Sequence, residues 1–290
     1  MSTQSIIAET GPVATGRVSS VATDLEMVHR GRVLSVLSDS YILARRSLMR
    51  VPRQPDWLMG VTIMPIMFLL LFRYIFGGTV QATMPPGVSA VNFLVAGIIV
   101  QGLVFGTLNT ALGLAQDAKD GIMDRFRALP MTRSSVLLGR ILADMAIATF
   151  TTTITIVVGL LVGFRPTANL WEWLAAIGLM LYLAFVLAWV GAVIGLWLKT
   201  IEAVNSIGFV IIFPLTFISS TFVSPEFMPS WLRGFAENQP FTLVLDGVRS
   251  LLTGYPEVGN KPWLAVLILT GMLVVAAPLA VWLYERRSKE

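Results

Sequence analysis

The sequence predicts an all-α integral membrane protein with six membrane-spanning helices, an amphipathic interfacial helix before the first span and short re-entrant external helices before the last. Three observations predict this class. Apolar residues make up 55% of the chain and charged residues only 13%, about half the charge of a soluble domain. The apolar residues gather in segments long enough to cross a hydrocarbon layer of about 30 Å as helices. Basic residues gather on one side of these segments.

Residues 1–33 are expected to form a disordered cytoplasmic tail, because the start of the chain, MSTQSIIAETGPVATGRVSS, is rich in Ser, Thr and Gly. This stretch has no basic start followed by an apolar core, so it is not expected to be a signal peptide. Residues 34–56 are expected to form an amphipathic connecting helix on the membrane surface. Its apolar stripe follows helical spacing at Leu34, Leu37, Tyr41, Ala44 and Leu48.

Residues 57–290 are expected to form the six-span domain. The spans are expected at residues 57–77, 91–115, 138–163, 171–198, 203–223 and 263–284. Most of the 21 Lys and Arg residues then fall on the side that holds both termini and the loop between the second and third spans, and the side richer in Lys and Arg is usually cytoplasmic. The second span is the least regular, because the amides of Asn92, Gln101 and Asn109 need partners in neighbouring helices.

Residues 224–260 are the longest external segment. Its apolar residues recur at helical spacing at Phe227, Met228, Trp231, Leu232 and Phe235. This pattern is compatible both with short helices that re-enter the outer interface and with an ordinary amphipathic loop.

The loop between the second and third spans is the most charged stretch near the spans, with the sequence DAKDGIMDRFRALPMTRSSVLLGR at residues 117–140. A helix is expected over 120–129, since Asp120 can cap it and Pro130 ends it. Apolar side chains, among them Phe126 and Leu129, then share one face and charges of both signs surround them. Such a ridge suits a groove on another protein; a tight turn lying on the membrane is the alternative.

This loop resembles the corresponding loop of type-2 ABC exporter permeases, most closely the daunorubicin/doxorubicin-resistance permease subfamily. The stretches FRYIFGG at 72–78, VGFRP at 162–166 and FPLTFISSTFVSPEFMPSWLRGFAENQP at 213–240 resemble that subfamily too. The resemblance implies a half-transporter in which residues of about 117–131 form a coupling helix. It implies two permeases, either a homodimer or a pair with a related permease, and two copies of a separate ABC ATPase subunit.

The residues that match the coupling motif are expected to contact the ATPase. They are Asp124, Arg125, Phe126, Arg127, Leu129, Pro130 and Arg133. The sequence has no G-x-x-x-x-G-K-[ST] motif, so ATP and magnesium are expected to be bound by the partner ATPase and no cofactor by this chain.

Other chemistry is disfavoured by composition. The chain has no Cys and a single His, so a metal centre or a catalytic site is not expected, and neither is an enzyme embedded in the membrane. Paired acids deep in one span, which a proton-coupled antiporter would usually need, are missing from the sequence. A passive channel would need a filter signature, and nucleic acid is not an expected partner.

A path for the transported compound is expected along the fifth span, IGFVIIFPLTFISSTFV, which in the resembled family lines the centre of the dimer. The candidate residues are Phe105, Asn109, Phe213, Thr216 and Phe217. A planar amphipathic compound could stack on the rings and hydrogen-bond to Thr216; alternatively, the rings only pack against the second span. The threonines at 149–155 are expected to pack and hydrogen-bond between helices, or else to line a pore.

The function that the sequence predicts is the permease of an ATP-driven exporter of hydrophobic or amphipathic compounds, as in drug efflux or antibiotic self-resistance. The alternative cargo is a cell-envelope lipid or a lipid-linked polysaccharide. The expected location is the bacterial plasma (inner) membrane, crossed several times in contact with membrane lipids, with both termini in the cytoplasm.

Overall fold

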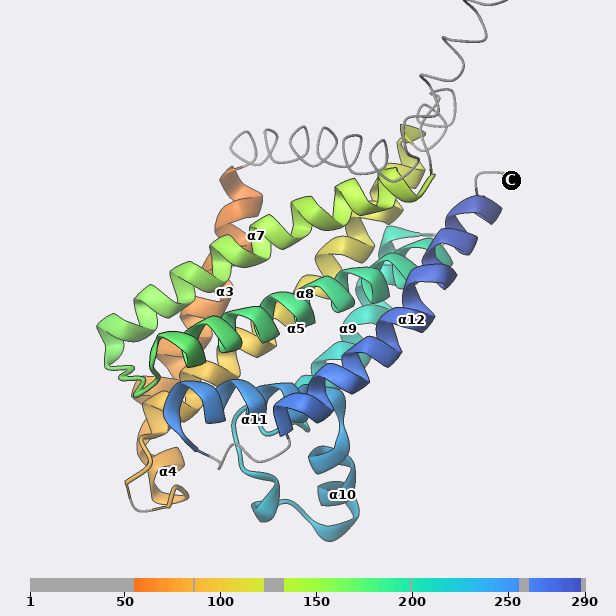
Figure 1. Ribbon diagram of the computed structural model, residues 1–290. Helices are drawn as coiled ribbons and strands as arrows, with labels where there is room; N and C mark the ends of the chain where they lie inside the picture. The colour runs from red at the N-terminus through yellow and green to blue at the C-terminus, as the bar shows by residue number, and fades with distance from the viewer. Residues whose placement is uncertain (1–54, 86, 123–132, 199, 256–260, 288–290) are drawn as a thin grey trace, which may run out of the picture.

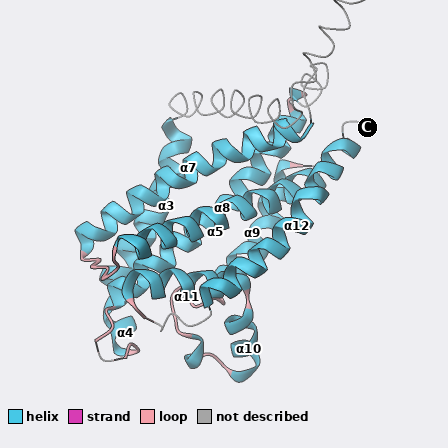
Figure 2. Ribbon diagram, in the orientation of Figure 1, coloured by secondary structure: helices cyan, strands magenta, loops and turns pink. Residues whose placement is uncertain are grey.

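The computed structural model describes residues 55–85, 87–122, 133–198, 200–255 and 261–287, and every regular element in these ranges is a helix (Figures 1 and 2). The long helices are α5 (Ala90–Lys119), α7 (Arg133–Val162), α8 (Leu170–Trp197) and α12 (Lys261–Arg287). The first apolar stretch continues from α3 (Pro55–Leu71) through a π-helical turn, η2 (Phe72–Phe76), into α4 (Gly77–Ala82). The shorter helices are α9 (Ile201–Phe217), η3 (Pro225–Phe227), α10 (Ser230–Asn238) and α11 (Pro240–Thr253).

Five helical stretches of the described chain are long and apolar enough to cross a membrane, namely Met59–Ala82, Ala90–Lys119, Ser135–Val162, Leu170–Trp197 and Pro262–Arg287. They coincide with five of the six predicted spans, although the first extends beyond the predicted residue 77. The sixth predicted span, at 203–223, corresponds in the structure to α9, a shorter apolar helix of 17 residues that ends at Phe217.

The polar residues that follow α9 explain its early end. The Ser219 hydroxyl donates to the carbonyl of Thr216 (2.5 Å), and the Thr242 hydroxyl of α11 accepts from the backbone N–H of Ser220 (3.3 Å). The Arg249 guanidinium donates hydrogen bonds to the carbonyls of Ser220 and Thr221. Hydroxyl side chains compete with a helix for its own backbone groups, so the chain turns here instead of continuing as a helix.

The centre of the bundle is α5, the most deeply buried of the spanning helices. It packs against α3, α7, α8, α9 and α11. Its fully buried side chains, such as Leu94 and Ile98, join Leu183 of α8 and Leu245 of α11 in one apolar cluster. Asn92 is paired, as expected for a polar residue in a span, because its amide exchanges two hydrogen bonds of 2.9 Å with the backbone of Arg165.

The two ends of the bundle differ (Figure 1). One end, called the Asp120 end below, is where α5 and α12 finish and α7 begins. The other, the α11 end, carries α10 and α11. There α11 buries an apolar face through Val244, Leu245 and Val248, whereas Trp231 and Phe235 of α10 are exposed. Short helices therefore occupy the predicted external region, and their entry into the membrane interface remains a prediction.

Several predicted segments lie outside the described residues. They are the tail at 1–33, the connecting helix up to residue 54 and the coupling residues from Asp124 to Pro130. Asp120 was expected to cap the coupling helix at its start. In the structure it closes α5, since its N–H donates to the carbonyl of Gln116 (2.9 Å) and Gly121 adopts a left-handed conformation (φ 67°).

Candidate functional site

Two long helices flank the segment that holds the predicted coupling motif. α5 and α7 each have 30 residues and so measure about 45 Å, about 15 Å more than a hydrocarbon layer. Their surplus length allows the ends at Lys119 and Arg133 to stand clear of the hydrocarbon. Of the predicted coupling residues, Arg133 is the first residue of α7, and the other six lie outside the described part of the chain.

A charged cluster joins these two helices near the predicted coupling motif. Arg140 of α7 pairs with Asp117 of α5 through Nη1 (3.2 Å) and with Asp144, one turn further along α7, through Nε (3.3 Å). Asp144 is the least exposed of the three, at 14% for its side chain. The Arg140–Asp144 pair has the i,i+4 spacing of neighbours on a helix, whereas the link to Asp117 depends on the packing of α5 against α7.

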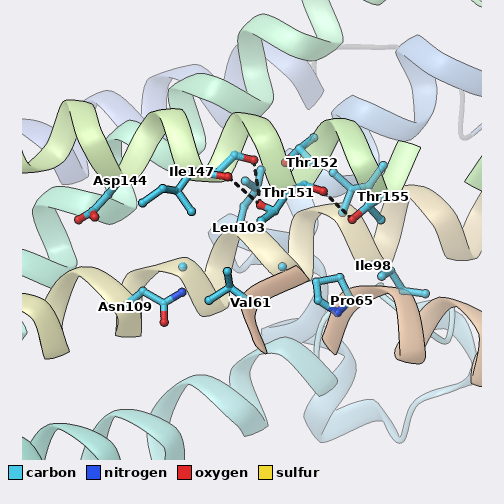
Figure 3. A pocket seen from close by; sticks show the side chains of 14 residues that line it. Val61, Pro65, Ile98, Leu103, Asn109, Asp144, Ile147, Thr151, Thr152 and Thr155 are labelled. Atoms are coloured by element: carbon cyan, nitrogen blue, oxygen red, sulfur yellow. Dashed lines mark hydrogen bonds between the residues drawn. The ribbon is translucent and has the colours of Figure 1, made fainter. Parts of the chain in front are cut away.

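A small pocket with a partly polar lining lies deeper between α3, α5 and α7 (Figure 3). We call it the threonine pocket. Its polar lining is Asn109, Asp144, Thr151, Thr152 and Thr155, and its apolar lining includes Val61, Pro65, Ile98 and Leu103. The cavity measures about 60 Å³. Drug-sized ligands occupy roughly 300–1,000 Å³, so in this conformation the pocket accommodates water-sized groups and not a drug.

Two of the three threonine hydroxyls in the pocket, those of Thr151 and Thr155, are turned toward their own helix. Thr151 donates to the carbonyls of Ile147 and Ala148 (3.1 Å each), and Thr155 donates to that of Thr151 (2.8 Å; Figure 3). The expectation that the threonines of this span hydrogen-bond between helices is wrong for these two residues. Because their backbone bonds satisfy the hydroxyls without a partner helix, α7 can move against α5 without leaving these donors unpaired.

A row of phenylalanines runs along α9 and onto its neighbours. Consecutive ring centroids are 6.4 Å apart for Phe105–Phe209, 5.0 Å for Phe209–Phe213, 4.5 Å for Phe213–Phe217, 5.0 Å for Phe217–Phe222 and 4.0 Å for Phe222–Phe72. These six residues are called the phenylalanine row. Phe209 is 47% exposed and Phe217 is 36% exposed, so the row has an open face within the single chain.

The structure separates the predicted path residues. Phe105, Phe213 and Phe217 belong to the phenylalanine row, whereas Asn109 lines the threonine pocket. Thr216 belongs to neither site: it is 1% exposed, and its hydroxyl donates to the Phe213 carbonyl (2.8 Å). Phe105 of the second span contacts Phe209 of α9, whereas Phe213 and Phe217 stack on each other and Phe217 also contacts Phe222.

At the α11 end, the structure adds Arg249, which the sequence analysis does not single out. Its side chain is 1% exposed and stacks on the Phe93 ring, with the guanidinium carbon 3.4 Å from the centroid. It donates to the carbonyls of Phe93 (3.0 Å), Ser220 (2.6 Å) and Thr221 (2.9 Å). One residue of α11 thus ties the start of α5 to the end of α9.

The electrostatics of Arg249 are dominated by burial. Burial lowers the pKa of its guanidinium to about 9, while attraction to Asp246, 3.8 Å away, opposes the shift. The group therefore stays charged at neutral pH. A signal was present in the sequence, because Asp246 and Arg249 are one turn apart in the otherwise apolar stretch PFTLVLDGVRSLLT, but its carbonyl partners are distant in the chain.

A second cavity lies beside Arg249 and measures about 280 Å³. Its lining combines rings, hydroxyls and carboxylates from the α11 end: Phe93, Ser220, Ser224, Pro225, Glu226, Glu237, Thr242, Asp246, Arg249 and Tyr255. Within the described residues, no group of three or more His, Asp or Glu side chains is arranged to hold a metal ion.

Comparison with known proteins agrees with this architecture. Residues 39–253 match the model of the family described as ABC-2 type transporter. The chain is 30% identical over 246 residues to the daunorubicin resistance ABC transporter permease protein DrrB1 of Streptomyces coeruleorubidus, covering 84% of each chain. It is 26% identical over 256 residues to the probable doxorubicin resistance ABC transporter permease protein DrrC of Mycobacterium tuberculosis, covering 87% of this chain and 90% of the relative. The putative transport permease ycf38 of Pyropia yezoensis is 27% identical over 227 residues, 75% of each chain.

Proposed function

Because this chain belongs to the ABC-2 type transporter permease family, we propose that it is the membrane subunit of an ATP-driven exporter of hydrophobic or amphipathic compounds. A permease of this family has no ATPase domain of its own, so a partner ABC ATPase supplies the hydrolysis. The named relatives are permeases of daunorubicin or doxorubicin resistance, and in this proposal the cargo of this chain has the same general chemistry.

The phenylalanine row is the observation that carries the cargo class. Its stacked rings and the exposed faces of Phe209 and Phe217 offer a long apolar surface within a membrane helix. Flat aromatic compounds gain from offset stacking as well as from burial. The cargo face proposed here consists of Phe209, Phe213 and Phe217, and leaves out Thr216 because its hydroxyl is buried.

Two copies of the chain would bring two such faces together. The exposed residues of α3 and α9 are large and apolar, including Met59, Ile63 and Met67 on α3 and Ile207 and Val210 on α9. Faces of this kind contact either lipid or protein within a membrane. We place a second copy there, with the cargo path between the copies, and two ATPase subunits at the Asp120 end against residues 124–133. This end and both termini are then cytoplasmic.

The test is ATP-dependent accumulation of a fluorescent planar amphipathic drug in inside-out membrane vesicles that contain the chain and its ATPase. Accumulation that is lost when the Walker A lysine of the ATPase is replaced supports the proposal. If instead the same vesicles move a lipid or lipid-linked polysaccharide and no drug of the panel, the cargo class is wrong. If ATP drives no transport of either kind, the exporter assignment is wrong as well.

A further inference from the structure

The ion pairs of Arg140 form a bridge between α5 and α7 at the Asp120 end. We call Asp117, Arg140 and Asp144 the charge clamp. The side chain of Arg140 is 26% exposed and that of Asp117 is 28% exposed, so the clamp is mostly shielded from water. A guanidinium that hydrogen-bonds to two carboxylates at once is held more firmly than one in a single surface pair. The clamp therefore couples the two helices that lead into and out of the coupling motif.

The backbone of α5 leaves room for this bridge at one position. Gly113 lies one turn before Asp117, and a Cβ at Gly113 would collide with the guanidinium of Arg140. Arg140 thus lies directly on the surface of α5. Next to it, Leu137 and Ile141 of α7 are fully buried in an apolar cluster that includes Leu114 of α5. This apolar contact holds α7 against α5 in addition to the ion pair.

The clamp also reaches the threonine pocket. Asp144 is both the partner of Arg140 and a lining residue of the pocket, in which it lies on the same side as Ile147 of α7 (Figure 3). The facing wall includes Asn109 of α5, and within the described residues the Asn109 amide makes no hydrogen bond. A shift of α7 against α5 would therefore change the distance between the two walls of the pocket.

We propose that Arg140 is a positioning residue of transport, through which the coupling motif controls the opening of the threonine pocket. The inference rests on the proposed function, because docking of the ATPase at residues 124–133 supplies the displacement. When the ATPase moves the motif, the clamp keeps α5 and α7 joined at the Asp120 end, so α7 turns against α5 about this point and the pocket walls further along the helices move to a second arrangement. Without the clamp, ATP hydrolysis continues but no longer changes the pocket.

The experiment uses the full chain with its ATPase in membrane vesicles. Because the chain contains no Cys, a single Cys at Thr152 reports on the pocket through its rate of alkylation by a small maleimide. The rate is measured without nucleotide and with ATP plus vanadate, and transport and ATP hydrolysis are measured in the same vesicles. In the wild-type background the two rates are expected to differ. Arg140→Ala is expected to abolish that difference and to lower the number of molecules transported per ATP by about 5- to 150-fold, the usual span of coupling between sites.

Gly113→Ala provides a second variant that leaves every charge in place. Its added Cβ displaces the flexible end of Arg140 and not backbone, and Ala favours a helix more than Gly does, so the fold is retained. It is expected to have the same effect as Arg140→Ala. The matched controls are Gly271→Ala in α12, where an added Cβ meets nothing within 4 Å, and Arg233→Ala, which removes the i,i+4 pair with Glu237 at the α11 end. Both are expected to behave as wild type.

The outcomes separate the inference from the proposed function. If wild type transports cargo while Gly113→Ala and Arg140→Ala keep both the nucleotide-dependent alkylation and the transport per ATP, the positioning role is wrong and the exporter assignment remains. If ATP drives no transport in wild type, both are wrong. A poorly folded Arg140→Ala protein would show a lowered melting temperature, and the decision then rests on Gly113→Ala.

Discussion

Replacing Arg249 by Ala is expected to destabilise the protein strongly, because its side chain holds three separate segments. Three buried carbonyls, of Phe93, Ser220 and Thr221, lose a charged donor, and each unsatisfied buried group costs about 1–3 kcal/mol. The guanidinium no longer has to be desolvated, which offsets part of that cost. Removing one member of a buried charged network typically leaves a net loss of about 3–5 kcal/mol.

The loss is measurable by thermal unfolding of the detergent-purified protein, followed by tryptophan fluorescence. For a chain of this size, about 1 kcal/mol lowers the melting temperature by roughly 2–4 °C, so a decrease of about 10 °C is expected. Arg249→Lys should recover little, because a lysine ammonium cannot reproduce the planar fork that reaches several carbonyls. Hydrogen exchange should also increase at residues 218–224, which Arg249 holds after the end of α9.

Arg233→Ala is the matched control, because Arg233 belongs to an exposed ion pair at the same end of the bundle. It should leave the melting temperature unchanged. Equal melting temperatures for Arg249→Ala and wild type would refute the reasoning, since they would mean that the three carbonyls are satisfied without the arginine.

Three further predictions concern coupling, topology and cargo. Phe126→Ala should weaken binding of the ATPase by about 10- to 150-fold, because burying one aromatic side chain contributes roughly 1.5–3 kcal/mol. Phe227→Ala at the α11 end should leave this binding unchanged. Equal pull-down of the ATPase by both variants would contradict docking at Phe126. A Cys at Ser134 should react with a membrane-impermeant maleimide only from the cytoplasm and a Cys at Thr167 only from outside, and the reverse pattern would overturn the orientation. Phe217→Ala should change which drugs of a panel are exported while protein level and basal ATP hydrolysis hold; a uniform loss for every drug would instead identify the ring as a packing residue.

The spans were predictable from the sequence because length and apolar content decide which helices can cross a membrane. The same rule overestimated the length of the helix at residues 203–223, which ends at Phe217. This stretch is apolar enough to span, but Ser219–Thr221 bond to α11 and to Arg249, which lies about thirty residues further along the chain. Such partners are set by tertiary packing, and no local pattern contains them.

In the candidate sites, too, local spacing predicts some contacts and tertiary packing determines the others. The candidate path predicted from the sequence included Phe213 and Phe217, and their rings stack in the structure. The continuation of the row onto Phe72 and the burial of Thr216 depend on how α9 lies against its neighbours. Likewise, i,i+4 spacing indicated the pair of Arg140 with Asp144, whereas the contact with Asp117 required the structure.

The attachment of Phe93 to Arg249 has a mechanical consequence for α5. That helix is held at its beginning by the Arg249 side chain and is contacted near its other end by the charge clamp at Asp117. Measured along the helix from Phe93, Asn109 lies about 24 Å away and Asp117 about 36 Å away. A rigid helix that pivots at Phe93 is a lever, and a sideways movement of about 3 Å at Asp117 becomes about 2 Å at Asn109 by this ratio. In the proposed mechanism, Arg249 of α11 would thus be the pivot that determines how far Asn109 moves when the ATPase displaces the Asp117 end of α5.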